Sequence, residues 1–362
     1  MIEVYYAVMF AILIFTLPLG SRRLVYAGGD NIWDYSPLNG LSDGGRKAAM
    51  TGGILIFLTL LPVVILRPET LPDYRMYEEM YSMGGGDRIN RDVEASFGVL
   101  TQFSPSFLML LGIYAVLSVG THVFAIFRNS PNIWLSFVIY LTYTFVLHDM
   151  IQMRAGVALG VLLIAVRFIR ERRIIPYFLC VVIAGWFHNS AWVFLFFYFL
   201  PSRSLNRWIW SAVLIVGLVA GLMNAQFGYI ARTIPIGFVQ SYVESYMGNK
   251  TFVPSEIGVV RIVKVILAIV MLFRQKEIVR HYPLAIPVLI FYMCSQLSYL
   301  LLSDIAVLQG RFGEMFAAFE VYSLAMFPMI SRKYYYALCA VPVVFLVYQH
   351  VGETVNLLTE AI

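Results

Sequence analysis

The part of this sequence that could do chemistry is a small set of ionisable side chains inside apolar stretches. A charged group at that depth is costly to bury, so it is usually retained to bind a substrate, carry a proton or pair with another charge. Arginine also presents a planar fork of N–H donors that matches the oxygens of phosphate and pyrophosphate. Several basic groups on one surface would therefore indicate an anionic ligand of that kind. The set comprises Arg154, His188, Arg261, Lys264, Arg311, Glu314 and Glu320.

The arginines Arg154, Arg261 and Arg311 lie on three different apolar segments, near the ends that we expect to share one face of a membrane. With Lys264, one helical turn after Arg261, they form the predicted binding surface for a phosphate-containing ligand, and Arg154 and Arg311 are its expected centre. The alternatives are structural. Arg154, Arg261 and Lys264 could extend to lipid headgroups, and Arg311 could pair with a neighbouring carboxylate such as Glu314.

Two histidines are candidates for proton transfer, because an imidazole has an unperturbed pKa near neutrality. His188 falls at a break in the apolar pattern, residues 187–190, where a ligand could reach it, and it is the preferred base. The alternative role for His188 is a hydrogen bond that closes the helix break. His148 is the rival base because it lies close to Arg154 in the sequence, although His148 and Asp149 could instead cap the helix that carries Arg154.

The sequence offers no support for metal, nucleotide or nucleic-acid chemistry. It contains no Asp-x-Asp pair for a metal-bound sugar nucleotide and no Cys/His cluster with zinc spacing. The segment 40–47 is glycine-rich, but it lacks the Gly-Lys-Ser/Thr ending of a phosphate loop and follows no strand. The net charge of +5 comes from short basic clusters between apolar runs. We therefore expect no metal, no cofactor and no nucleic-acid partner.

The elements that position these residues are expected to be membrane helices. Of the 362 residues, 60% are hydrophobic and 13% are charged, against about 25% charged residues in a soluble domain. We predict an all-α, polytopic integral membrane helix bundle that forms a single transmembrane domain over residues 1–362. About 12 membrane segments are expected, some of them short or re-entrant. They are 2–19, 50–66, 105–126, 131–147, 153–169, 174–187, 190–200, 208–224, 256–273, 283–302, 313–330 and 335–350.

The segments 174–187 and 190–200 are too short for ordinary spans, and together they predict a broken or re-entrant hairpin. With the N-terminus outside, this hairpin keeps the basic clusters at 170–173 and 203–207 on the cytoplasmic side. That is the distribution of basic residues that membrane proteins prefer. The same topology places His188 toward the outer side.

Two loops, 67–104 and 225–255, are long and amphipathic, and we expect them to cover the outer mouth of the bundle. In the first loop, Asp73 is expected to cap a short helix that carries tyrosines on one face. These tyrosines are Tyr74, Tyr77 and Tyr81.

Glycine spacing predicts where helices pack closely. Gly156 and Gly160, and likewise Gly217 and Gly221, are about one helical turn apart. Small residues at this spacing let membrane helices approach one another, so we expect both pairs at helix–helix contacts.

The same residues carry a resemblance to a known family. The motif Gln152-Met-Arg154-Ala-Gly156-Val-Ala158, a basic turn and then Trp186-Phe-His188-Asn-Ser190-Ala191 resemble the pattern of EpsG-like, Wzy-type bacterial polysaccharide polymerases. Upstream, Asp73-Tyr74-x-x-Tyr77-x-x-x-Tyr81 resembles the first outer loop of that family. Downstream, Gly310-Arg311-Phe312 resembles its late arginine. Glu94-Ala-Ser-Phe97-Gly98 fits the family's acidic-Gly-aromatic pattern only loosely, so no role is assigned to Glu94.

The resemblance implies a membrane glycosyltransferase that acts on an oligosaccharide repeat unit carried by undecaprenyl pyrophosphate, at the outer face of a bacterial inner membrane. A sugar hydroxyl would attack the anomeric carbon of the growing chain while the lipid pyrophosphate leaves. Flippase and chain-length regulator proteins would be partners, besides the lipid bilayer. Together with the charges above, the resemblance predicts His188, Arg154 and Arg311 as catalytic residues. The predicted substrate-binding residues are Asp73, Tyr74, Tyr77, His148, Gln152, Arg261 and Lys264.

Two other functions stay open at this point. A ligase of lipid-linked glycans would share the helix bundle and the pyrophosphate chemistry, although some ligases have a large outer domain. A flippase or transporter would be expected to bind its substrate near the midplane of the membrane, often between inverted repeats. The charges here gather toward one face instead, which favours a site open to one compartment.

Overall fold

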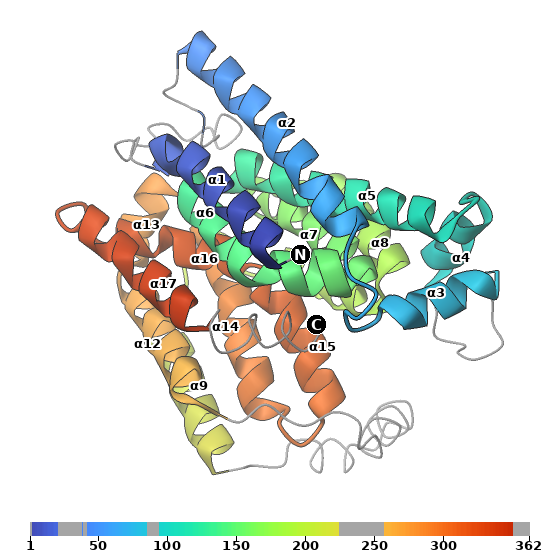
Figure 1. The fold of residues 1–362 in the computed structure, drawn as a ribbon. Coiled ribbons are helices and arrows are strands. Elements are labelled where there is room, and N and C mark those ends of the chain that lie inside the picture. Colours follow the sequence, from blue (N-terminus) through green and yellow to red (C-terminus); the bar gives the residue numbers. More distant parts are fainter. Residues whose placement is uncertain (1, 21–37, 39–41, 85–93, 224–256, 350–362) are drawn as a thin grey trace.

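The computed structural model describes residues 2–20, 38, 42–84, 94–223 and 257–349, and in these ranges the chain folds into helices joined by short turns (Figure 1). No strand occurs in the described ranges, so the predicted all-α class is confirmed. The helices are α1 (Ile2–Gly20), α2 (Asp43–Ile65), α3 (Tyr74–Ser82), α4 (Ala95–Gln102), α5 (Phe107–Asn129), α6 (Ile133–Ile139), η2 (Tyr140–Ile151), α7 (Met153–Glu171), α8 (Ile174–Phe187), η3 (Asn189–Phe199), α9 (Arg207–Leu222), α12 (Val259–Phe273), α13 (Gln275–His281), α14 (Ala285–Leu301), α15 (Ala306–Ala317), α16 (Glu320–Met326), η4 (Phe327–Ile330) and α17 (Tyr335–Gln349).

Short polar side chains begin several of these helices. Oγ of Ser42 at the start of α2 and Oγ of Ser106 at the start of α5 each accept a hydrogen bond from a backbone N–H three residues on, at 3.2 Å. The side-chain oxygens of Asn132 and Asn206 do the same for α6 and α9. Such caps satisfy first-turn N–H groups, which have no partner within the helix. The polar residue before each apolar run therefore fixes where the helix starts.

Large apolar side chains point outward from the bundle as well as inward. Ile175 of α8, Phe196 of η3, and Trp208 and Val216 of α9 are all exposed. Extended apolar surface is unfavourable in water and favourable against lipid. Three segments of the described chain are also long and apolar enough to cross a membrane: α2, α5 and the continuous α6–η2 segment, Ile133–Ile151. The chain is a helical membrane protein.

Two of the expected segment boundaries need correction, and the expected number of about 12 membrane segments is not confirmed. Besides the three long segments, the shorter apolar helices found in the described ranges are 10–17 residues long. The predicted segment 131–147 continues to Ile151, with a π-helix in its second half. The predicted segment 313–330 is divided into α15, α16 and η4. Phe319 at the first division packs on Phe291 (ring centroids 4.3 Å apart), so apolar burial continues where the helix does not.

Helices α5 and α7 pack closely in the middle of the bundle because α7 carries glycine on the contact face. A Cβ atom on Gly156 would collide with Oγ of Ser118 and would lie 2.5 Å from the carbonyl oxygen of His148. One on Gly160 would collide with Oγ1 of Thr121. Both distances are shorter than side chains tolerate, so only glycine allows this approach.

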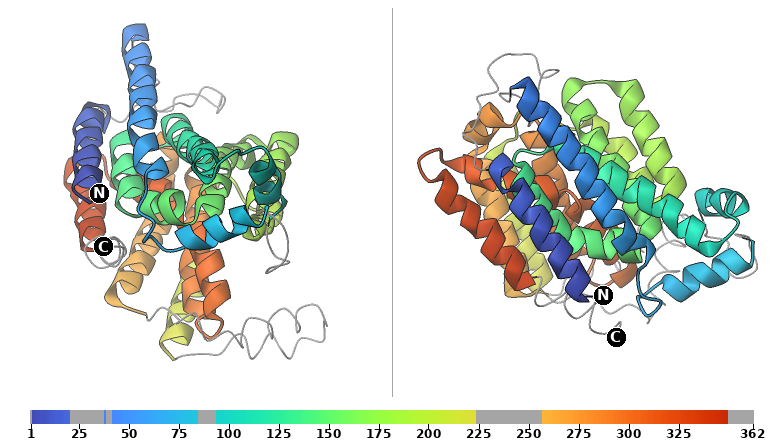
Figure 2. Two further views of the ribbon diagram at one scale, coloured as in Figure 1. Left: turned by 45° about the vertical axis from the view of Figure 1, so that its right-hand side comes forward. Right: turned by 45° about the horizontal axis from the view of Figure 1, so that its top comes forward.

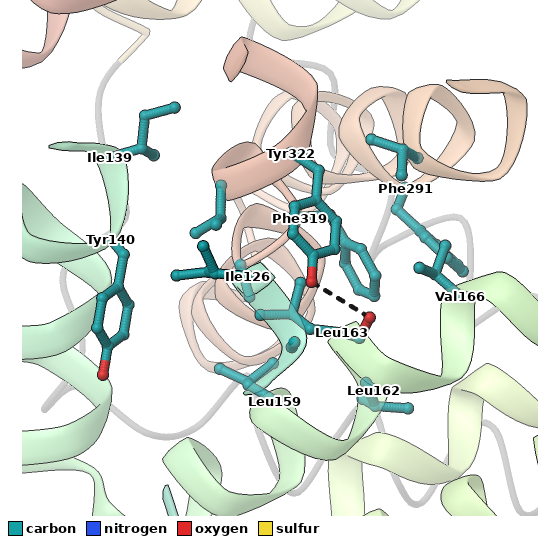
Figure 3. Packing of buried hydrophobic residues seen from close by; sticks show 14 of the residues in the cluster. Ile126, Ile139, Tyr140, Leu159, Leu162, Leu163, Val166, Phe291, Phe319 and Tyr322 are labelled. Carbon is teal, nitrogen blue, oxygen red and sulfur yellow. Dashed lines mark hydrogen bonds between the residues drawn. The ribbon is translucent and has the colours of Figure 1, made fainter. Parts of the chain in front are cut away.

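The second glycine pair makes the equivalent contact in the C-terminal half of the chain. A Cβ atom on Gly217 would lie 2.8 Å from a methyl carbon of Leu297, and one on Gly221 would lie 2.8 Å from the carbonyl oxygen of Leu300. The prediction that both pairs mark close helix contacts is confirmed. Figure 3 shows part of the buried core, where the hydroxyl of Tyr322 on α16 donates to the carbonyl oxygen of Leu163 on α7.

Helices α8 and η3 form the predicted hairpin. The hydroxyl of Tyr177 on α8 donates to the carbonyl oxygen of Phe194 on η3 (2.6 Å). Farther from the tip, the guanidinium of Arg172 donates to the carbonyl oxygens of Tyr198 (2.8 Å) and Leu200 (3.0 Å). The two basic ends of the hairpin therefore lie together, and His188, in extended backbone, forms the tip at the other end.

The first amphipathic loop contains the short helix expected from its tyrosines. Tyr74 packs edge-on against Phe107 at the start of α5 (5.3 Å between ring centroids), and the hydroxyl of Tyr81 donates to the carbonyl oxygen of Ser104. Figures 1 and 2 show the resulting α3–α4 pair at one end of the bundle. The capping prediction is wrong in one respect. Asp73 occupies the N-cap position, but its backbone is left-handed (φ 66°) and its side chain makes no capping hydrogen bond. The second loop, 225–255, lies outside the described residues.

Candidate functional site

A buried carboxylate, Glu94, lies at the centre of the candidate site. It precedes α4 and accepts hydrogen bonds with both oxygens. Oε1 lies 3.1 Å from Nδ1 of His188 and 3.3 Å from the backbone nitrogen of Asn189, and Oε2 pairs with Nη1 of Arg154. Glu94 is separated from Arg154 by 60 residues and from His188 by 94 residues. One side chain therefore joins the first loop, the start of α7 and the tip of the hairpin.

Arg154 is held by aromatic rings as well as by Glu94. Its guanidinium carbon lies 5.3 Å from the ring centroid of Tyr77 and 6.0 Å from that of Phe97. Cation–π contacts of this kind stabilise a guanidinium that has lost part of its water. Nε of Arg154 is buried and makes no hydrogen bond among the described residues. The site thus contains a fixed positive charge and, on the same side chain, an N–H group without a hydrogen-bond partner in the described residues.

The loop side of the site has perturbed titrations. Burial works to raise the pKa of Glu94, but the hydrogen bond from His188 and the charge of Arg154 outweigh it, so the pKa of Glu94 is below its usual value. Burial raises the pKa of Asp73, and the charge of Arg154 offsets part of that rise. The contacts of Glu94 therefore favour its charged form, whereas burial disfavours the charged form of Asp73.

Sequence reasoning missed a second cation, Arg67, and assigned no role to Glu94. Arg67 follows α2, and its Nη1 donates to the carbonyl oxygen of Met150. Burial lowers the pKa of Arg67 to about 10, while the nearby phenol of Tyr77 favours its charged form. Because Tyr77 also interacts with Arg154, the two arginines flank one tyrosine. A signal was present in the sequence, since Arg67 directly follows an apolar run.

Gln152 and Arg311 are brought toward the same region by a contact between α7 and α15. Nε2 of Gln152, at the N-cap position of α7, donates to Oε2 of Glu314 (3.2 Å). Arg311 is exposed and lies three residues, about one helical turn, before Glu314 on α15. That Arg154 and Arg311 serve one site stays a prediction.

His148, the rival base, is fully buried in η2 and is not exposed to a ligand from outside. Neither His148 nor Asp149 caps α7, because that helix starts after Gln152, and the capping alternative is wrong. Asp149 instead belongs to a buried polar cluster. Its carboxylate lies 3.2 Å from Nδ1 of His122 and accepts hydrogen bonds from two hydroxyl groups, those of Ser118 and Tyr140. The sequence position of His122 indicates no such role.

Arg261 and Lys264 belong to a second polar cluster, formed by α12, α14 and α16. Nζ of Lys264 lies 2.9 Å from Oε2 of Glu320, and both side chains are buried. Arg261 donates to Oε1 of Gln296 (2.9 Å), and its guanidinium carbon lies 3.7 Å from the ring centroid of Tyr299. Glu320 is thus a buried partner of a lysine, and the charge of Lys264 is already compensated inside the protein.

The arrangement around Glu94 is suited to proton transfer beside a bound anion. His188 is the most accessible member, Arg154 supplies positive charge, and Tyr77 and Phe97 wall off the guanidinium. In the described part of the chain, no three His, Cys, Asp or Glu side chains converge as ligands for a metal ion.

The sequence model of the EpsG family matches residues 52–357, a range that includes all of the candidate-site residues described in this subsection. No significant match was found among curated proteins or among solved structures.

Proposed function

Because the chain belongs to the EpsG family of membrane proteins of polysaccharide biosynthesis, we propose that it is a glycosyltransferase that polymerises oligosaccharide repeat units carried on undecaprenyl pyrophosphate. The site would lie at the outer face of the bacterial inner membrane, where the hairpin tip contacts Glu94 at the start of α4. The observation that carries the proposal is the convergence of Glu94, Arg154 and His188 from three distant segments.

The proposed reaction transfers the growing glycan from its lipid carrier to the next lipid-linked repeat unit. The acceptor hydroxyl oxygen forms a bond to the anomeric carbon, and the bond from that carbon to the pyrophosphate oxygen breaks. His188 accepts the hydroxyl proton. The lipid pyrophosphate leaves with the electron pair of the broken bond. A general base in the position proposed for His188 accelerates a reaction by about 10²–10⁴-fold.

The leaving pyrophosphate gains negative charge as its bond breaks, and fixed positive groups that face it lower the barrier. Arg154 would be one such group, since its guanidinium is held beside Glu94 and shielded from water by the rings of Tyr77 and Phe97. Arg311, exposed on α15, would contact the same pyrophosphate from the opposite side. Asp73 and Tyr74 would contact the glycan in the covering loop. Tyr77, predicted as a further substrate contact, is buried and would act through Arg154 instead.

The proposal is tested by the surface polysaccharide of a bacterial strain that lacks the gene. Loss of a polymerase leaves single repeat units attached to the cell surface in place of long chains. A strain complemented with the wild-type gene serves as the control. Complete loss of surface glycan, single units included, would indicate export or ligation and would contradict the proposed polymerisation.

A further inference from the structure

The contact between Glu94 and His188 supports an inference about how the base is prepared, and this inference rests on the proposed function. We propose that Glu94 is a positioning residue that binds the Nδ1–H of His188 and leaves Nε2 as the basic nitrogen facing the substrate. The sequence alone assigns no role to Glu94, and its part in the reaction follows from its contacts.

The contact defines the tautomer of His188. An ionised carboxylate can only accept hydrogen bonds, so Nδ1 of His188, 3.1 Å from Oε1 of Glu94, must carry a proton. In a neutral imidazole the other nitrogen, Nε2, then has the free lone pair. Because the pKa of Glu94 is below its usual value, the carboxylate is ionised at neutral pH.

Two further donors keep the carboxylate in place. The N–H of Asn189 donates to Oε1 (3.3 Å), and Arg154 holds Oε2. With both oxygens bound, Glu94 cannot rotate away from the imidazole without breaking a charged contact. An amide in place of the carboxylate has only one acceptor oxygen and would direct an NH2 group at a donor. The arrangement therefore requires a carboxylate.

Exposure distinguishes the positioning group from the group that meets the substrate. The side chain of His188 is 21% exposed and that of Glu94 is 6% exposed. His188 also lies in extended backbone between the end of α8 and the start of η3, at the tip of the hairpin. The imidazole is therefore the member of the pair that an acceptor hydroxyl can approach.

Several charged or titratable groups surround the pair, and they set the expected pH dependence. Glu94, at the start of α4, faces His188 directly, and His148 of η2 lies near enough to interact with its charge. Arg154 of α7 faces Glu94 from the other side. The phenols that face this cluster from α3 and α5 are those of Tyr77 and Tyr114. In the described part of the chain, the charged group that contacts the imidazole directly is Glu94, so its replacement should affect the pH dependence most.

The inference is tested with Glu94→Gln, Glu94→Asp and His188→Ala in the full-length protein. Glu277→Gln is the matched control, because Glu277 also pairs with an arginine but is exposed on the surface. Glu94→Gln should lower kcat by about 10²–10⁴-fold, as expected when a base loses its orientation. The pH profile of Glu94→Gln should also differ from that of wild type, because the carboxylate no longer contacts the imidazole. Glu94→Asp keeps the charge and should recover part of the rate with a wild-type profile.

A second readout does not depend on activity. Nitrogen NMR of histidine-labelled protein reports which ring nitrogen carries the proton, and the His188 signal is the one missing from His188→Ala. Wild type should show the Nδ1–H tautomer, and Glu94→Gln should lose this preference. A wild-type tautomer and pH profile in a folded Glu94→Gln protein would overturn the positioning role.

Two further outcomes separate this inference from the proposed function. If His188→Ala stays within about tenfold of wild type while Glu94→Gln is inactive, Glu94 itself is the base and the positioning role is wrong. If the wild-type protein makes no polymer but shows the Nδ1–H tautomer that Glu94→Gln loses, the proposed function fails and the positioning role stands.

Discussion

Replacing Arg154 with lysine keeps a positive charge at the start of α7 and removes the planar fork of donors. In the structure, Nη1 of this fork pairs with Glu94, and Nε is buried without a hydrogen-bond partner in the described part of the chain. A lysine ammonium is a single point of charge, so it can stay with Glu94 or move to a ligand, but it cannot do both.

The expected cost is kinetic. Loss of one preorganised donor to a developing anion lowers kcat by about 10²–10³-fold, equivalent to about 2.7–4 kcal/mol in the barrier. Stability should change little, by about 1 kcal/mol or less, because the charge beside Glu94 is retained and the arginine side chain is partly exposed. Arg154→Met should behave differently. It leaves the Glu94 carboxylate without the guanidinium, so part of the cost of breaking a fully buried pair, about 3–5 kcal/mol, is expected.

The assay measures kcat and KM on lipid-linked repeat units together with the thermal unfolding of each purified variant. Arg280→Lys is the matched control, since Arg280 also pairs with a glutamate but on the exposed surface of α13. A folded Arg154→Lys protein with wild-type kcat would contradict the predicted role of the arginine donor fork. It would reduce Arg154 to an ion-pair partner of the loop.

Further predictions concern stability and topology. Lys264→Met should leave the buried Glu320 without its charged partner and destabilise the protein by about 3–5 kcal/mol. The measurement is the thermal unfolding midpoint in detergent, which should fall. An unchanged midpoint would mean that the pair is not formed. Gly160→Leu should force α5 and α7 apart and cost at least about 1–3 kcal/mol, and a wild-type midpoint would contradict their close packing. The pKa of Glu94 is depressed below its ordinary value of 4.5, so its contacts should contribute stability above about pH 4.5 and lose it as the pH falls through the depressed value. Glu94→Gln should therefore show a weaker loss of stability in acid than wild type, and identical acid titrations would argue against the pair. Ser204→Cys should not react with an impermeant thiol reagent added from outside, because both basic ends of the hairpin are expected inside.

The helices and the hairpin could be predicted because each depends on local pattern. Apolar runs and their polar borders define α2 and α5, and the break in the apolar pattern between α8 and η3 defines the hairpin. The orientation of the hairpin in the membrane stays a prediction. The glycine pairs were also informative, since small residues one turn apart on a membrane helix are typical of a face that another helix approaches. The interrupted segment 313–330 was not predictable in the same way. Hydrophobicity reports burial, and burial continues through Phe319 although the helix does not.

The polar partnerships could not be predicted, because they depend on which faces meet. Arg154 and His188 stood out as ionisable groups in apolar surroundings, but nothing local indicates that Glu94 joins them. The same limit applies to Lys264. From its position on a helix it was an apparent ligand for an anion, and only the packing of α12 against α16 reveals Glu320 as its partner.

Polymerisation of lipid-linked repeat units is tested most directly with the purified protein in lipid vesicles. The vesicles contain a single synthetic substrate, the repeat unit on undecaprenyl pyrophosphate. The products are separated by length, and the released lipid pyrophosphate is counted. The structure and the proposed chemistry predict a ladder of chains that differ by one repeat unit, with one lipid pyrophosphate released for each bond formed. Transport of the substrate across the vesicle membrane with no change in its length would contradict the claim.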